Sequence, residues 1–241
     1  MKKMTYSSAG VDIDAGELAT KKISRLAKKT FNSRVLTEIG LFAGAYDIGG
    51  EKILLSSADG VGTKLIVASM AGIYNTVGID LVHHCANDIA VHNAEPLFFL
   101  DYIGHSNLSV DRISEIVEGL SDGCNHIGAP LIGGETAQMP GIYPPDEFDL
   151  VGFIVGMVDK DKIVLGREIK AGDVIIALPS NGLHTNGYSL ARKVLFDVGK
   201  FSIDDHIDEL GESVGEALLK PHTLYLDAVR LVRDRVQIKG M

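Results

Sequence analysis

Apolar and polar residues alternate along the chain with two different periodicities. Runs in which apolar side chains recur every three to four residues predict helices, and short, mostly apolar runs predict strands. A polar residue, Asp14, precedes the first helical run and is expected to cap it. The predicted helices cover residues 15–30, 80–93 and 110–127, and the predicted strands cover 53–57, 96–103, 130–132 and 148–158. Because strands and helices alternate, the pattern favours an α/β fold.

A charged stretch interrupts this pattern after the last of these strands. Residues 159–173 have the polarity of a surface connection, and a new apolar run at 174–178 predicts the first strand of a second unit. We therefore expect an N-terminal domain over residues 1–168 and a second domain over 169–241. About 70 residues is little for an independent core, so we expect the second domain to be incomplete.

Composition and charge exclude several classes of function. The chain has 241 residues, 46% of them hydrophobic, and a formal net charge of −9, which argues against nucleic acid or an anionic membrane as a partner. No apolar stretch approaches the ~20 residues of a membrane span. The two cysteines form neither a disulfide framework nor a zinc motif. These features favour a soluble protein of the cytoplasm.

The segment Asp-Gly-Val-Gly-Thr-Lys, directly after the first predicted strand, has the parts of a phosphate site. Gly60 and Gly62 let backbone N–H groups approach a phosphate. Thr63 and Lys64 add a hydroxyl and an ammonium, and Asp59 can hold Mg²⁺. The spacing is not that of a Walker A motif, and a glycine-rich structural turn is the competing interpretation.

Polar residues of the predicted helix at 80–93 share one face. Asp80, His84 and Asp88 are four residues apart and stack along that face, with Asn87 beside them. At a rise of about 1.5 Å per residue, Asp80 and Asp88 are about 12 Å apart, so one metal ion cannot bind both. Asp88 is the better candidate ligand, and a solvated polar face is the alternative.

Two later segments repeat the combination of glycine and polar side chains after a strand. Gly133 and Gly134 precede Glu135, which is a further candidate metal ligand, with a structural turn as the alternative. A second segment, typical of an anion-binding loop, follows the run at 174–178 and precedes a helix, with a capped turn as its alternative. This segment covers residues 180–187 and includes His184, Thr185, Asn186 and Gly187. Acids on several elements would suit two Mg²⁺ ions on a triphosphate.

Six motifs in this order resemble the phosphoribosylformylglycinamidine cyclo-ligases, also called aminoimidazole ribonucleotide synthetases. The resemblance covers the chain from Tyr6 to about Tyr225. The motifs are AGVDIDAG at 9–16, SADGVGTK at 57–64, GIDLVHHCANDI at 78–89, NAEPLFFLDY at 93–102, GGETAQMPGIY at 133–143 and HTNGYSLAR at 184–192. Each motif is weak by itself, but six in register are specific.

The resemblance implies an ATP-dependent ring closure of formylglycinamidine ribonucleotide in purine biosynthesis, with ATP and Mg²⁺ as cofactors. It implies that Asp59, Asp88 and Glu135 hold Mg²⁺ on the ATP phosphates, and that residues 184–189 meet the ribotide. We take Asp88, His184 and Lys64 as the catalytic candidates, and the glycines at 60, 62, 133 and 134 with Thr63 as nucleotide-binding candidates.

The family's fold implies an N-terminal domain with a mixed sheet that pairs with a second copy into a dimeric β-barrel, followed by an α/β domain. The family carries a glycine-rich segment beyond the position of Met241, so we expect this chain to lack part of its second domain. A related small-molecule kinase, such as a thiamine-monophosphate kinase, is the rival enzyme. An inactive nucleotide-binding dimer is the rival from another class.

Overall fold

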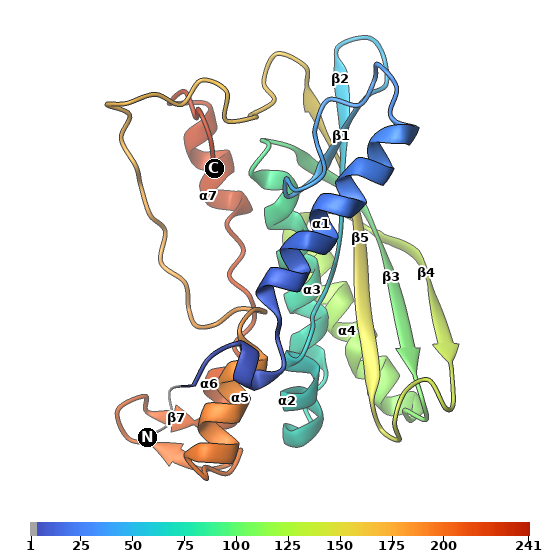
Figure 1. Ribbon diagram of the computed structural model, residues 1–241, viewed down its shortest axis with the longest axis vertical. Coiled ribbons are helices and arrows are strands. Elements are labelled where there is room, and N and C mark those ends of the chain that lie inside the picture. Colours follow the sequence, from blue (N-terminus) through green and yellow to red (C-terminus); the bar gives the residue numbers. More distant parts are fainter. Residues whose placement is uncertain (1–3) are drawn as a thin grey trace.

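The computed structural model describes residues 4–241, and its centre is a five-stranded sheet (Figure 1). The strands are β1 (Gly44–Asp47), β2 (Lys52–Gly60), β3 (Glu95–His105), β4 (Leu131–Gln138) and β5 (Phe148–Asp159). Their order in the sheet is β1-β2-β5-β3-β4. β3 and β4 pair in parallel and the other neighbours are antiparallel, so the sheet is mixed and the predicted α/β class is confirmed.

Two long helices, α3 (Asn75–Ala90) and α4 (Val110–Ile127), cover one face of this sheet (Figure 1). Apolar side chains of both layers form the core, among them Ile53, Leu55, Leu81, Ile89, Phe99 and Ile154. The two helices approach closely because a glycine lies at their contact. A Cβ on Gly119 would stand 1.8 Å from the carbonyl oxygen of Asn75. This close packing fixes α3, which carries most of the polar residues discussed below.

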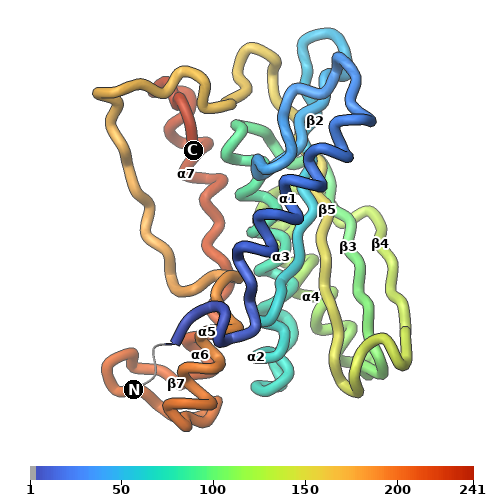
Figure 2. The backbone as a smooth tube through the Cα atoms, viewed as in Figure 1, coloured from blue at the N-terminus to red at the C-terminus, as the bar shows by residue number. Residues whose placement is uncertain are grey.

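The chain beyond residue 187 forms a smaller unit, which packs against helices α2 (Lys64–Ala71) and α3 of the preceding part. Its elements are α5 (Tyr188–Arg192), the π-helix η3 (Lys193–Val198), β6 (His206–Ile207), β7 (Glu212–Ser213), α6 (Val214–Leu219) and α7 (Leu226–Arg233). α6 contacts α2, and α7 contacts α3. Figure 2 shows the connection from β5 to α5 as a long loop, which first passes beside α7 and then runs apart from the helices and the sheet.

The N-terminal helix α1 (Ile13–Ala27) lies between two short 3-10 turns, η1 (Ser7–Ala9) and η2 (Lys28–Thr30). Its cap is Asp12, whose Oδ1 accepts a hydrogen bond from the Ala15 amide at 2.9 Å, so the prediction that Asp14 caps the helix is wrong. Asp14 lies in the first turn, where its charge still favours the helix dipole. No helix among residues 4–241 has both the length and the apolar character needed to cross a membrane.

Three other predicted elements differ from the structure. α3 begins at Asn75, five residues before the predicted start. Gly133 and Gly134 lie inside β4, because parallel pairing with β3 continues through them. The strand predicted at 174–178 does not form, and Val174 and Ile175 are 86% and 94% exposed. Among the described residues no strand pairs with this run, and without a partner its backbone gains no ladder hydrogen bonds.

Candidate functional site

β2 and α3 bring two carboxylates and an imidazole together. Ligand atoms of Asp59, His84 and Asp88 all lie within 4.8 Å of one another. Asp59 comes from the end of β2, and His84 and Asp88 are one turn apart on α3. The Nε2 of His84 lies 3.0 Å from Asp59 Oδ2, and the Ser57 hydroxyl donates to Asp88 Oδ2 at 2.8 Å. This group, the acidic cluster, is a candidate metal site.

The electrostatics of the acidic cluster favour a cation at its centre. Burial raises the pKa of Asp59, but the hydrogen bond and charge of His84 outweigh burial, and the pKa falls below its usual value. Burial lowers the pKa of His84, but the hydrogen bond to Asp59 and the charges of the nearby carboxylates together outweigh burial, and the pKa is raised. Burial raises the pKa of Asp88, offset in part by the bond from Ser57. The carboxylates of the cluster thus favour a positive charge beside them, which a protonated His84 or a divalent cation can supply.

The acidic cluster opens into a cavity of about 600 Å³ that also contains part of the predicted substrate loop. The cavity is lined by Leu41, Phe42, Ser57, Ala58, Asp59, Gly60, Val61, Gly62, His84, Asp88, Thr185 and Asn186. Thr185 Oγ1 lies 3.1 Å from His84 Nδ1, so the imidazole ring of His84 contacts Asp59 through one nitrogen and the loop through the other. A phosphate bound here would face carboxylates at one wall and glycine backbone at another.

Several residues predicted for the site lie elsewhere. Lys64 is fully buried, with its Nζ 2.7 Å from Asp80 Oδ2. Burial lowers the pKa of Lys64 and raises that of Asp80, while their mutual attraction acts in the opposite direction on each. Because its ammonium is enclosed, Lys64 does not point into the cavity as the phosphate interpretation requires. Thr63, next to it, meets Ser189 through their hydroxyls at 3.0 Å.

Glu135 is not part of the acidic cluster. It lies on β4 beside Gly133 and Gly134, opposite Tyr102 of β3, and none of these residues lines the cavity of the cluster. A Cβ on Gly134 would stand 2.3 Å from Asp101 Oδ1, so this glycine permits close packing inside the sheet. The structure thus gives Gly134 a packing role in the sheet, whereas a Cβ on Gly133 would make only ordinary contact with Leu100, at 3.5 Å.

His184 and His222 stack beside the cavity with ring centroids 4.1 Å apart. The Nε2 of His184 lies 3.3 Å from Thr223 Oγ1. Burial and the neighbouring histidines lower the pKa of His222 to about 3, so this ring is neutral near pH 7. The sequence pattern did not reveal His222, because a single histidine after a proline has no motif spacing. It also assigned no role to the contact of His84 with Asp59, which only the fold creates.

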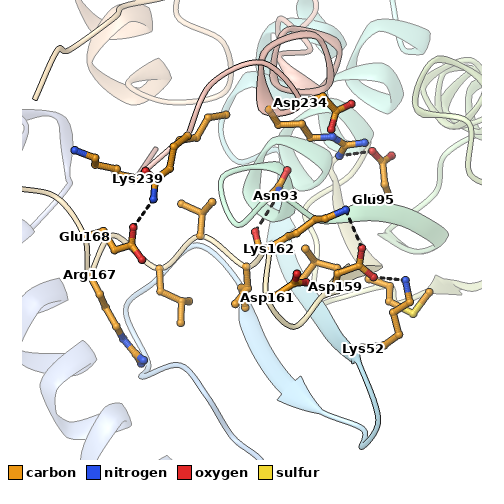
Figure 3. Close-up of a pocket in the computed structure, with 18 of the residues that line it drawn as sticks. Lys52, Asn93, Glu95, Asp159, Asp161, Lys162, Arg167, Glu168, Asp234 and Lys239 are labelled. Atoms are coloured by element: carbon orange, nitrogen blue, oxygen red, sulfur yellow. Dashed lines mark hydrogen bonds and ion pairs between the residues drawn. The ribbon is translucent and has the colours of Figure 1, made fainter.

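A second cavity, of about 660 Å³, lies between the start of the β5–α5 connection and the last residues of the chain (Figure 3). Its charged side chains are largely paired with one another. Lys162 contacts Asp159 at 3.2 Å, Arg233 contacts Glu95 at 2.5 Å, and Gln237 donates to Glu168 at 2.7 Å. These pairs leave few free charges to recognise an ionic ligand.

Both parts of the chain match domains of one known family. Residues 41–158 match the N-terminal domain of AIR synthase related proteins, and residues 170–241 match the C-terminal domain. The phosphoribosylformylglycinamidine cyclo-ligase of Alkaliphilus oremlandii is 46% identical over 99% of this chain and 71% of its own length. That of Syntrophotalea carbinolica is 51% identical over 100% of this chain and 70% of its own length.

Solved structures show the same fold at low sequence identity. Thiamine monophosphate kinase from Aquifex aeolicus has a TM-score of 0.60 and 17% identity, over 88% of this chain and 64% of that one. The kinase from Stenotrophomonas maltophilia has a TM-score of 0.56 and 21% identity, over 85% and 62%. The fold and the sequence matches define an AIR synthase related protein. The chain belongs to the phosphoribosylformylglycinamidine cyclo-ligase family and spans about 70% of the length of its curated relatives.

Proposed function

We propose that this chain performs the ring closure of formylglycinamidine ribonucleotide to aminoimidazole ribonucleotide, with conversion of ATP to ADP and phosphate. The observation that carries this proposal is one cavity lined by the acidic cluster and by Thr185 and Asn186, in a chain about half identical to cyclo-ligases. The reaction needs a nucleotide and a ribotide side by side, and this cavity joins a phosphate-type wall to a second polar loop.

The chemistry asks for positioning and neutralisation of charge. The amide oxygen of the substrate is a poor leaving group until the γ-phosphoryl group of ATP is transferred to it. The neighbouring amidine nitrogen then attacks the amide carbon, the C–O bond breaks, and the oxygen leaves as phosphate while the nitrogen loses a proton. Each step gains from fixed geometry more than from a strong acid or base.

The residues present fit Mg²⁺ at the acidic cluster. Asp59 and Asp88 supply hard oxygen ligands, and Mg²⁺ is usually held by one or two carboxylates plus substrate phosphates. A bound Mg²⁺ would neutralise phosphate charge during transfer. The backbone at Gly62, with φ of +71°, can approach a phosphate without a side chain in the way. Glu135 remains a sequence prediction, and the proposal does not use it.

Thr185 and Asn186 form the proposed ribotide side of the cavity, and His184 and Gly187 flank them in the same loop without lining it. Asn186 lines it with an amide that can both donate and accept hydrogen bonds. His184 adopts a left-handed conformation, with φ of +57°. The neutral His222 behind it leaves the loop without an extra positive charge.

We also propose that two copies pair through the sheet. The face of β5 opposite the helices carries Val151, Phe153, Val155 and Met157, which are half-buried or exposed, and Phe153 is 40% exposed. Contiguous apolar surface of this kind is typical of a protein interface. A second copy of this sheet would cover it, as the barrel of the family implies.

A turnover experiment separates ring closure from its rivals. The chain is mixed with Mg-ATP and either formylglycinamidine ribonucleotide or thiamine monophosphate, and ADP and products are quantified by chromatography. We expect ADP only with the ribotide, in equal amount to aminoimidazole ribonucleotide. ADP formed with thiamine monophosphate would favour the kinase, and no ADP with either substrate would favour a nucleotide-binding remnant.

A further inference from the structure

α3 has two sets of polar side chains with different partners. His84 and Asp88 belong to the acidic cluster. Asp80, His83 and Asn87 face the chain segment of residues 220–225, which connects α6 to α7. We call these three residues the docking strip. The spacing of three and four residues places them along one stripe of the helix.

The docking strip binds the main chain of this segment. Asp80 Oδ1 accepts a hydrogen bond from the His222 amide at 2.7 Å, and His83 Nδ1 lies 2.6 Å from the His222 carbonyl oxygen. Asn87 makes two bonds: its Nδ2 donates to the Thr223 carbonyl at 2.8 Å, and its Oδ1 accepts from the Tyr225 amide at 2.8 Å. These four contacts hold the backbone of the segment at residues 222, 223 and 225.

Lys64 completes this arrangement from α2. Its Nζ donates to Asp80 Oδ1 at 2.9 Å and to the Lys220 carbonyl oxygen at 2.8 Å. Asp80 and Lys64 are both fully buried. A buried ion pair that also satisfies two backbone groups of another segment is costly to rearrange, because each freed group would remain without a partner.

The segment in turn holds the proposed ribotide loop. Asn181 Nδ2 donates to the Pro221 carbonyl oxygen at 2.8 Å, and the Tyr225 hydroxyl donates to the Pro179 carbonyl oxygen at 2.9 Å. The ring of His184 stacks on His222. The 220–225 segment is therefore an intermediate layer, with α3 on one side and residues 179–188 on the other.

We propose that Asp80, His83 and Asn87 are positioning residues. By hydrogen bonding to the main chain of residues 222–225, they place the loop at 179–188 over the acidic cluster. One helix then sets both sides of the cavity, because His84 and Asp88 directly follow His83 and Asn87 of the docking strip in sequence. The stretch that precedes this loop, residues 167–178, is almost wholly exposed and offers the loop little support. Lys64 acts through Asp80 in this arrangement and does not touch a ligand.

Hydrogen exchange followed by mass spectrometry tests the proposal in the whole chain, with Asn87→Ala as the variant. Loss of two hydrogen bonds to the backbone should make exchange in peptides covering 221–225 faster by a factor of roughly 5 to about 100. The proposal adds that peptides covering 179–188, which Asn87 does not touch, speed up as well, while β2 peptides stay unchanged. Asn125→Ala, an exposed asparagine of α4, is the matched control and should change none of them.

Faster exchange at 221–225 with no change at 179–188 would overturn the proposal, because the strip would then hold only its own segment. If Asn87→Ala exchanges faster everywhere, Asn87→Asp replaces it: this variant keeps the acceptor for Tyr225, loses the donor to Thr223 and adds one negative charge. The same two outcomes then decide.

Binding measurements add a readout that separates positioning from general damage. This part rests on the proposed function, since it uses formylglycinamidine ribonucleotide as the probe of the loop. Calorimetry on Asn87→Ala should show a ribotide Kd raised by about 10-fold or more, with the Kd of a magnesium-bound, non-hydrolysable ATP analogue within 2-fold of wild type. Equal weakening of both would contradict positioning. Absence of ribotide binding by the wild type would refute the proposed function, while the exchange experiment would still decide the role of the strip.

Discussion

Lys64→Met provides a sharp test, because sequence and structure assign this lysine different roles. As a phosphate ligand, Lys64 would be dispensable for folding, and its loss would weaken nucleotide binding. In the structure its ammonium is enclosed and paired with Asp80, with a further bond to the Lys220 carbonyl oxygen. Methionine has a similar volume, so the substitution removes the charge and these bonds while leaving little empty space.

The magnitude follows from the burial of the pair. Breaking a fully buried ion pair by removing one partner costs about 3–5 kcal/mol, since the other charge stays buried without compensation. In a chain of this size, each kcal/mol lowers the melting temperature by roughly 2–4 °C. We therefore expect Lys64→Met to melt about 6–20 °C below wild type, as followed by circular dichroism.

A double variant makes the cause explicit. Lys64→Met with Asp80→Asn removes both charges and keeps an oxygen to accept the bond from the His222 amide. This protein should recover most of the lost stability, because neither charge remains buried. A melting temperature of Lys64→Met within 2 °C of wild type, together with a weakened Kd for an ATP analogue, would refute the reasoning and restore Lys64 to the phosphate site.

Three further predictions concern the acidic cluster, the helix contact and the sheet face. The pKa of His84 is raised above 6.5 and that of Asp59 is lowered below 3.8. Their pairing therefore contributes its full stabilisation to the fold between pH 3.8 and pH 6.5. Metal-free wild type should therefore exceed His84→Ala in unfolding free energy by a margin that shrinks as pH rises above 6.5; a margin constant to pH 9 would contradict this. Gly119→Ala should cost at least ~2–3 kcal/mol in denaturant unfolding, because its Cβ would overlap Asn75, whereas Gly16→Ala in open space should not destabilise. Light scattering should give a dimer mass for wild type and for Val110→Asp, and a monomer mass for Phe153→Asp; a monomeric wild type at micromolar concentration would contradict sheet pairing.

The long, strongly periodic elements could be predicted from the sequence, and those that depend on distant partners could not. The helix at 110–127 agrees at both ends, because Ser109 caps it and Gly128 follows it with φ of +73°. The run at 174–178 has strand composition but no neighbouring strand among the described residues. β-structure depends on such pairing more than a helix does.

The candidate site divides in the same way. Helical spacing placed His84 and Asp88 on one face of α3, and the structure brings them beside Asp59. Contacts between residues of different secondary-structure elements could not be predicted from the sequence. Lys64 looked like a phosphate ligand because of the glycines before it, but its partner, Asp80, is sixteen residues away and enclosed with it. Glycine spacing reports what the backbone permits, and not where the next side chain points.

The central claim is that Asp59 and Asp88 hold a divalent cation beside the proposed ribotide loop. Its most direct test is calorimetric titration of Mg²⁺ with a non-hydrolysable ATP analogue into wild type, Asp88→Asn, and Asp122→Asn, an exposed α4 carboxylate with the same change of charge. We expect Mg²⁺-dependent affinity to fall by about 10-fold or more, roughly 1.4 kcal/mol, in Asp88→Asn and to stay at the wild-type value in Asp122→Asn. Wild-type affinity in Asp88→Asn would contradict the claim and would indicate that the cation binds elsewhere in the fold.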